Sequence, residues 1–110
     1  MRAARLRRSS DIEMLRAEGH SVRRPSFVAR LRQTAGTGPR LAVTAPRTLG
    51  RSVARNRARR RVREAFRLAF AELTTAPSVD LLVSARREAA SAPFAALRAE
   101  AASLIEEARR

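Results

Sequence analysis

The sequence has no cysteine, no lysine, no tryptophan and no tyrosine, and it has one histidine among its 110 residues. Without cysteine, the chain can form neither a disulfide framework nor a thiolate metal site. No apolar run approaches the roughly 20 residues of a membrane span, and polar residues follow the basic N-terminus where a signal peptide would be apolar. These absences predict a cytoplasmic protein that does not associate with membranes.

Groups that could catalyse a reaction are also scarce. Metal-assisted hydrolysis needs paired carboxylates, and general acid–base catalysis most often uses a histidine with partners. His20 directly follows Gly19 and is predicted to be a turn residue, while Asp11 and Glu13 point to different sides of a helix, which disfavours a two-metal site. We therefore expect no catalytic residue and no metal ligand in this chain.

Positive charge is abundant by contrast. The chain has 24 basic residues against 10 acidic ones, a net charge of +14, and every basic residue is an arginine. The planar fork of arginine suits the paired oxygens of a phosphate. Residues 1–71 carry 19 arginines and four acids, whereas residues 72–110 carry five arginines and six acids. The first two thirds of the chain are therefore expected to attract a polyanion.

A basic helix is predicted in the middle of the chain. Nine arginines lie between Arg47 and Arg67, with Glu64 as the one acid, yet apolar residues recur at helical spacing from about Ser52 to about Leu73. The buried stripe of this helix would consist of Ala58, Val62, Ala65, Phe66, Ala69, Phe70 and Leu73. Because solvated helix faces normally mix charges of both signs, the pattern favours nucleic-acid binding over a face that contacts nothing in particular.

Helical geometry divides the polar residues of this helix into groups. An outward row suited to phosphates consists of Asn56, Arg60, Arg63 and Arg67. Arg55 falls in the sector of the buried stripe, so it is expected to lean toward the sheet and line a groove. Asn56 has an alternative role as a cap at the start of the helix. The positive end of the helix dipole, beside Arg47 and Arg51, is a further expected anion site.

The rest of the chain predicts one small α+β domain. Residues 1–8 are expected to form a flexible basic arm and residues 9–110 the domain. The pattern predicts a short helix ending near Gly19 and a strand over 21–32 that forms a hairpin with a second strand over 41–45. After the basic helix come an interior strand over 79–85 and a last helix that starts at Pro93. Helices would thus pack against a small sheet.

One segment, from Leu41 to Phe66, has a distinctive combination of residues. Its centre is Arg55, Asn56 and Arg57, with Gly50 and Val53 ahead and Arg59, Arg60, Arg63, Glu64 and Ala65 behind. The segment closely resembles the signature region of the protein subunit of bacterial ribonuclease P. The basic arm, the short helix, Gly19, the first strand with Phe27 and Val28, and the last strand and helix are similar as well, so the resemblance covers most of the chain.

The resemblance implies a fold like that of the second domain of ribosomal protein S5. This is an α-β sandwich of order αβββαβα, with about four strands and with helices packed on the sheet. The connection around the signature helix would be a left-handed crossover. Because connections between parallel strands are right-handed almost without exception, this expectation comes from the resemblance alone.

The resemblance also implies a function. Similar proteins are accessory subunits of ribonuclease P, which bind ribonuclease P RNA and the 5′ leader of precursor tRNA. The RNA performs the endonucleolytic cleavage that matures the tRNA 5′ end, with Mg2+ held mainly by the RNA and not by protein side chains alone. The residues matched to RNA binding are Arg47, Arg51, Arg55, Asn56, Arg57, Arg59, Arg60, Arg63 and Arg67. The candidates for the leader cleft are Ile12, Arg16, Val28, Arg30 and Arg32.

The cleft candidates depart from the family pattern. Many relatives have aromatic side chains in the first helix and first strand, where this chain has Ile12, Arg16 and Arg30. Stacking on a base contributes roughly 1 to 3 kcal/mol. We hypothesise that Arg16 and Arg30 grip leader phosphates or stack through their guanidinium planes, which would make leader binding less selective for base.

Two other classes of protein fit parts of the pattern. A noncatalytic ribosomal or assembly protein would share the fold and the basic helix. A DNA-binding regulator would place the arginine helix in a major groove, but no partner helix of a helix-turn-helix precedes it and Pro46 links it to strands instead. DNA is therefore not the expected partner.

Overall fold

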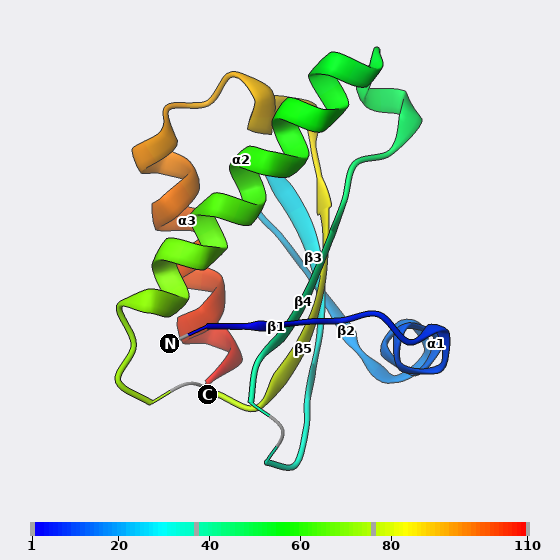
Figure 1. Ribbon diagram of the computed structural model, residues 1–110, viewed down its shortest axis with the longest axis vertical. Coiled ribbons are helices and arrows are strands. Elements are labelled where there is room, and N and C mark those ends of the chain that lie inside the picture. The colour runs from blue at the N-terminus through cyan, green and yellow to red at the C-terminus, as the bar shows by residue number, and fades with distance from the viewer. Residues whose placement is uncertain (1, 37, 76, 110) are drawn as a thin grey trace.

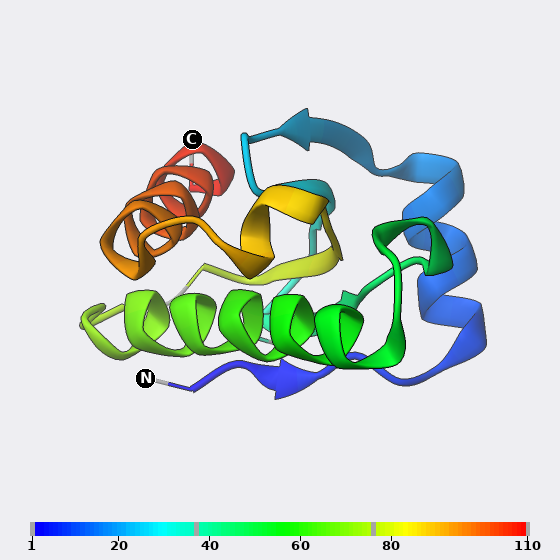
Figure 2. The same cartoon turned by 90° about the horizontal axis from the view of Figure 1, so that it is seen from above.

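The computed structural model describes residues 2–36, 38–75 and 77–109. The elements are β1 (Ala4–Arg5), α1 (Ser9–Glu18), β2 (His20–Arg23), β3 (Phe27–Gln33), β4 (Arg40–Thr44), the 3-10 helix η1 (Arg47–Leu49), α2 (Ser52–Ala71), β5 (Val79–Ala85), the 3-10 helix η2 (Arg87–Ala90) and α3 (Phe94–Ala108). The strands form one sheet in the order β1-β4-β5-β3-β2. In Figures 1 and 2, α2 and α3 cover one face of this sheet and α1 lies on the other. The α+β class is as predicted.

The main core lies between the sheet and the helices α2 and α3. Alternation along β3 buries Phe27, Ala29 and Leu31 on this face, while the side chains between them lie on the α1 face. The ring of Phe27 packs against Phe66 of α2 at a centroid distance of 5.3 Å, and Phe66 packs against Phe70 at 6.4 Å. Every predicted stripe residue of α2 from Ala58 to Phe70 is buried, so the hydrophobic period of this helix was interpreted correctly.

The connection from β4 through α2 to β5 joins two neighbouring parallel strands. It passes over the face that carries α3, and when this face is viewed with β4 and β5 pointing upward, as they do in Figure 1, the chain moves leftward from β4 to β5 (Figures 1 and 2). The crossover is therefore left-handed, as the resemblance implied and against the general rule.

The predicted hairpin is wrong. The residues from 21 to 32 form two strands, β2 and β3, that pair antiparallel with each other around Pro25, and β4 does not pair with β3. β5 lies between them instead, antiparallel to β3 and parallel to β4. The reason is that five of the seven residues of β5 are apolar and that the strand has buried residues on both faces, and such a strand is most stable at the centre of a sheet.

The sheet also has one more strand than expected, because part of the predicted basic arm is β1. Ala4 and Arg5 pair parallel with Arg40 and Leu41 of β4. The backbone N–H of Ala4 donates to Pro39, that of Leu6 donates to Leu41, and the side chain of Leu6 is only 3% exposed. Burial of the Leu6 side chain therefore helps to hold β1 against β4, although the basic composition of residues 1–8 had suggested a flexible arm.

Candidate nucleic-acid interface

The outer face of α2 presents the predicted arginine row. Arg60, Arg63 and Arg67 are exposed, and within the described part of the chain no hydrogen bond or ion pair involves the guanidinium of Arg60 or Arg63. Arg67 is paired, since its Nε donates to Glu64 Oε2 at 2.9 Å and its Nη2 to Oε1. These hydrogen bonds lower the pKa of Glu64 and raise the pKa of Arg67. The row therefore keeps donors available for an anion.

Asn56 lies in the second turn of α2, which begins at Ser52. The alternative role of Asn56 as a helix cap is therefore excluded. Its side chain is exposed, and Oδ1 accepts a hydrogen bond from Nη2 of Arg59 one turn later. The side-chain NH2 group of Asn56 is thereby left without a described protein partner, and Arg59 is half-exposed.

Two further arginines of α2 are used within the fold. Arg57 Nε donates to the carbonyl oxygen of Ala90 at 2.9 Å, and Arg61 donates to the carbonyl oxygens of Ala89 and Ala92 at 2.7 and 2.5 Å. These carbonyls belong to η2 and to the link before α3. Arg57 and Arg61 therefore fasten α2 to this segment, a role that sequence periodicity gave no sign of. Arg57 remains exposed and can still offer its terminal nitrogens to a partner.

The start of α2 is open to an anion. No side chain caps its N-terminus, so the backbone N–H groups of the first turn remain available. Gly50 has φ of 116°, a conformation that favours glycine, and it turns the chain from η1 into the helix. The exposed residues Arg47 and Arg51 flank this turn. Arg55 is half-buried as expected, and its Nη2 donates to Ser52 Oγ at 3.3 Å.

A cleft of about 400 Å³ lies between η1 and the end of the sheet. It is lined by Val28, Pro46, Thr48, Leu49, Ser84, Ala85, Arg86, Arg87 and Glu88. Of the predicted cleft residues, only Val28 lines this hollow. Ser84 and the segment 86–88 were not predicted, because their proximity to η1 depends on β5 being central in the sheet.

The other cleft candidates gather around α1. Arg30 holds the C-terminal end of this helix, because its guanidinium donates to the carbonyl oxygens of Leu15, Arg16 and Gly19, the last at 2.6 Å. It also donates to Ser21 Oγ at 3.0 Å. Arg30 is thus largely committed to a helix cap, whereas Arg16 presents an exposed side chain that makes no described hydrogen bond.

The end of α1 is closely packed at Gly19. A Cβ atom at this position would collide with the carbonyl oxygen of Leu15, so the close approach requires glycine although its φ is an ordinary −72°. Arg32, one pleat after Arg30, forms an ion pair with Glu18 at 3.1 Å. Ile12 is half-buried on the same helix. These contacts fix the position of α1 on the sheet.

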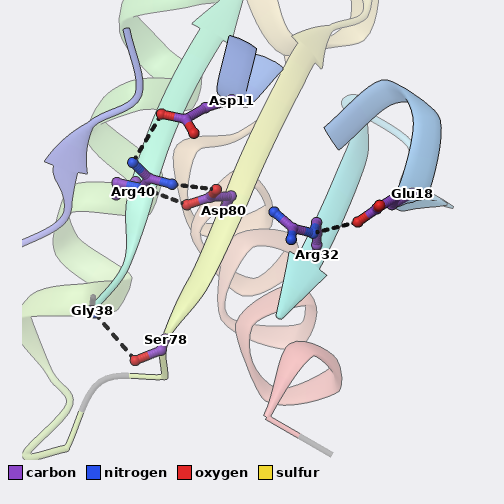
Figure 3. A network of polar contacts seen from close by, with 7 residues as sticks. All are labelled: Asp11, Glu18, Arg32, Gly38, Arg40, Ser78 and Asp80. Atoms are coloured by element: carbon purple, nitrogen blue, oxygen red, sulfur yellow. Dashed lines mark hydrogen bonds and ion pairs between the residues drawn. The ribbon is translucent and has the colours of Figure 1, made fainter. Parts of the chain in front are cut away.

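The other end of α1 is held by an ion network (Figure 3). Arg40 of β4 donates through Nε and Nη2 to the two carboxylate oxygens of Asp80, at 2.7 and 2.6 Å, and through Nη1 to Asp11 at 3.1 Å. The hydrogen bond to Asp80 raises the pKa of Arg40, so the residue is charged at any physiological pH. The network ties α1 to the two central parallel strands.

The structure offers neither a metal cluster nor a membrane helix among the residues it describes. No three histidine or acidic side chains there lie close enough together to hold a metal ion. Asp11 and Asp80 both bind Arg40. No helix in the described ranges is both long enough and apolar enough to cross a membrane.

Comparisons with known proteins agree with this architecture. The ribonuclease P protein of Thermotoga maritima has a TM-score of 0.77 and 27% sequence identity, with 94% of this chain and 96% of that one covered. The protein of Staphylococcus aureus has a TM-score of 0.75 and 24% identity, with 99% and 100% covered. No curated protein matches the sequence. The family described as Ribonuclease P matches residues 1–109, and the chain therefore belongs to the ribonuclease P protein family.

Proposed function

We propose that this chain binds the RNA subunit of ribonuclease P and the 5′ leader of precursor tRNA, and thereby promotes the cleavage that matures the tRNA 5′ end in the cytoplasm. The observation that carries the proposal is the outer face of α2. There, Arg60 and Arg63 have guanidinium groups without a protein partner in the described chain, and the open start of the same helix lies about two turns before Arg60. Such a surface suits the phosphate oxygens of a bound nucleic acid.

The chemistry is assigned to the RNA in this proposal. Asp11 and Asp80 both bind Arg40, which supports assigning the Mg2+ ions to the RNA. Magnesium ions held by RNA phosphates would supply the activated water. The protein would contribute binding energy and position, by neutralising the charge between the catalytic RNA and its substrate.

Reconstitution tests this function. Addition of the purified protein to ribonuclease P RNA and precursor tRNA at low Mg2+ should restore release of the 5′ leader. Failure to stimulate cleavage would refute the proposal, and stable binding to ribosomal RNA without stimulation would favour the noncatalytic ribosomal alternative. Equal competition by duplex DNA would favour the DNA-binding alternative instead.

The leader is proposed to cross the α1 face of the sheet, from the cleft beside η1 toward α1. Val28 and Ser84 lie on the floor of this path and Arg87 at its rim. Arg16 lies on α1 with an exposed side chain. Because Arg30 already makes several hydrogen bonds to the end of α1, we assign the phosphate contact to Arg16 and a supporting role to Arg30.

Replacement of Arg16 and of Arg30 separates these roles. Arg16→Ala should weaken binding of leader-containing precursor tRNA several-fold and leave the free energy of unfolding unchanged. Arg30→Ala should destabilise the protein by about 1 to 3 kcal/mol, because the hydrogen bonds of its charged group to the end of α1 are lost. Urea unfolding and binding of precursor tRNA with and without a leader, at two salt concentrations, measure both effects. Unchanged leader binding by Arg16→Ala would remove Arg16 from the path.

Glu64 moderates the charge of the arginine row. Glu64→Gln should strengthen RNA binding several-fold, since it removes the one negative charge of α2 and releases Arg67 from its ion pair. Because the folded-state pKa of Glu64 is lowered, this pair persists at neutral pH and is lost only as the pH falls through that lowered value. Filter binding at pH 7 checks the prediction, with Glu106→Gln on α3 as the control. Equal gains in both variants would indicate a general charge effect.

A further inference from the structure

A second hollow lies beside the arginine row, between β1 and α2. It has a volume of about 450 Å³ and is separate from the cleft beside η1. One wall is the N-terminal segment from Arg2 to Leu6, the other is the C-terminal half of α2, and β4 forms the floor. Figure 2 shows β1 running alongside α2 at this place.

The hollow is lined by arginines and by no acidic residue. Arg63 and Arg67 contribute from α2 and Arg2 and Arg5 from the N-terminal segment, over an apolar base that includes Leu41 and Phe70. Four cations around one concave surface repel one another. Of these four arginines, only Arg67 has an acidic partner among the described residues. A bound anion would relieve this repulsion.

The docking of β1 directs its charge toward α2. Leu6, directly after the strand, is buried outside the main core cluster, whereas Ala3, directly before it, packs against that cluster. Arg2 and Arg5 both line the hollow, opposite Arg63 and Arg67 of α2. Backbone hydrogen bonds and Leu6 hold β1, and no described hydrogen bond or ion pair uses the guanidinium of Arg2 or Arg5.

We infer that this groove is a second contact site for RNA backbone, in which Arg2 and Arg5 clasp phosphates from one side while Arg63 and Arg67 clasp them from the other. An RNA strand lying along the outer row at Arg60 reaches the groove without interruption, because Arg63 and Arg67 belong to both surfaces. The inference deepens the proposed function and rests on it. It extends the interface from one helix to a two-walled cradle.

The double variant Arg2→Ala with Arg5→Ala tests the groove. Affinity for ribonuclease P RNA should fall about tenfold at moderate salt, and the slope of log affinity against log salt should decrease by about two. The matched control, Arg23→Ala with Arg109→Ala, removes the same charge from the opposite edge of the sheet and from the end of α3. An equal loss in the control would reduce the effect to net charge and overturn the inference. Unchanged urea midpoints verify that β1 remains docked.

A crosslinking measurement locates the contact directly. The chain contains no cysteine, so Ala4→Cys carries a single photoreactive label at the groove and Ala102→Cys carries one on the exposed side of α3. Crosslinks to the RNA from position 4 but not from position 102 are expected. If the unmodified protein stimulates cleavage while position 4 gives no crosslink and the arginine variant binds normally, the groove inference fails alone. If the unmodified protein neither binds nor stimulates, the proposed function itself fails.

Discussion

Affinity for ribonuclease P RNA is expected to fall by about a thousandfold or more between 50 and 200 mM salt, as for a protein that neutralises six or more phosphates. Exposed arginines in or beside β1, η1 and α2 provide this number. These residues are Arg2, Arg5, Arg47, Arg51, Arg60, Arg63 and Arg67. Each phosphate contact releases condensed counterions, and added salt opposes that release. Filter binding over a range of salt concentrations measures the slope.

A variant links this salt response to α2. Arg60→Ala with Arg63→Ala should reduce the slope by about two and weaken assembly with the RNA, because both guanidinium groups face solvent. The free energy of unfolding should stay within about 0.5 kcal/mol of the original, as is usual for surface substitutions. A flat salt response of the unmodified protein would contradict the assignment of α2 as the contact surface. If the double variant keeps the salt slope of the unmodified protein, the phosphate contacts lie outside Arg60 and Arg63.

Arg40→Ala is expected to destabilise the fold by about 3 to 5 kcal/mol, the usual effect of leaving a buried charge without its partner. The side chain of Asp80 is 1% exposed and lies in the central strand, where Arg40 supplies both of its described hydrogen bonds. Asp11 would lose its tie to the sheet in the same variant, so α1 should also loosen. Urea unfolding measures the first effect, and hydrogen exchange of the α1 amides measures the second.

Arg32→Ala is the matched control for this prediction. Arg32 lies on the same face of the sheet, also bonded to a carboxylate of α1, but Glu18 is 59% exposed (Figure 3). Exposed pairs contribute about 0 to 1 kcal/mol, so this variant should be nearly as stable as the original protein. Similar losses in Arg32→Ala and Arg40→Ala would show that burial of Asp80 is not the cause.

Features that depend on local period were predictable. The stripe of α2 recurs every three or four residues, and five of the seven residues of β5 are apolar, so both elements have bounds close to those expected. The outward position of Arg60 and Arg63 follows from the same period. Such features depend only on the spacing of residues within one helix or strand.

Features that depend on distant strands were not predictable. The closeness of β3 and β4 in sequence favours a hairpin between them, yet β5 separates the two strands in the sheet. Strand β1 has only two residues, and it forms because β4 offers a free edge and because Leu6 finds a buried place. No periodic signal marks a strand of this length.

The tasks of individual arginines were the hardest to assign. Periodicity gives the direction of a side chain but not the acceptor that it meets. Arg30 and Arg61 bind backbone carbonyls at the ends of α1 and η2, and those carbonyls are placed there only by the complete fold. A sequence in which every cation is an arginine does not distinguish structural from RNA-facing residues.

The central place of β5 has a consequence for synthesis of the protein. Until residues 79–85 have emerged from the ribosome, β3 and β4 lack the strand that lies between them. The nascent chain therefore lacks the middle of its sheet. Contacts between segments so far apart in sequence form late and slowly. The arginine-rich portion is therefore expected to leave the exit tunnel unstructured, exposed to any nearby polyanion until the final third of the polypeptide arrives.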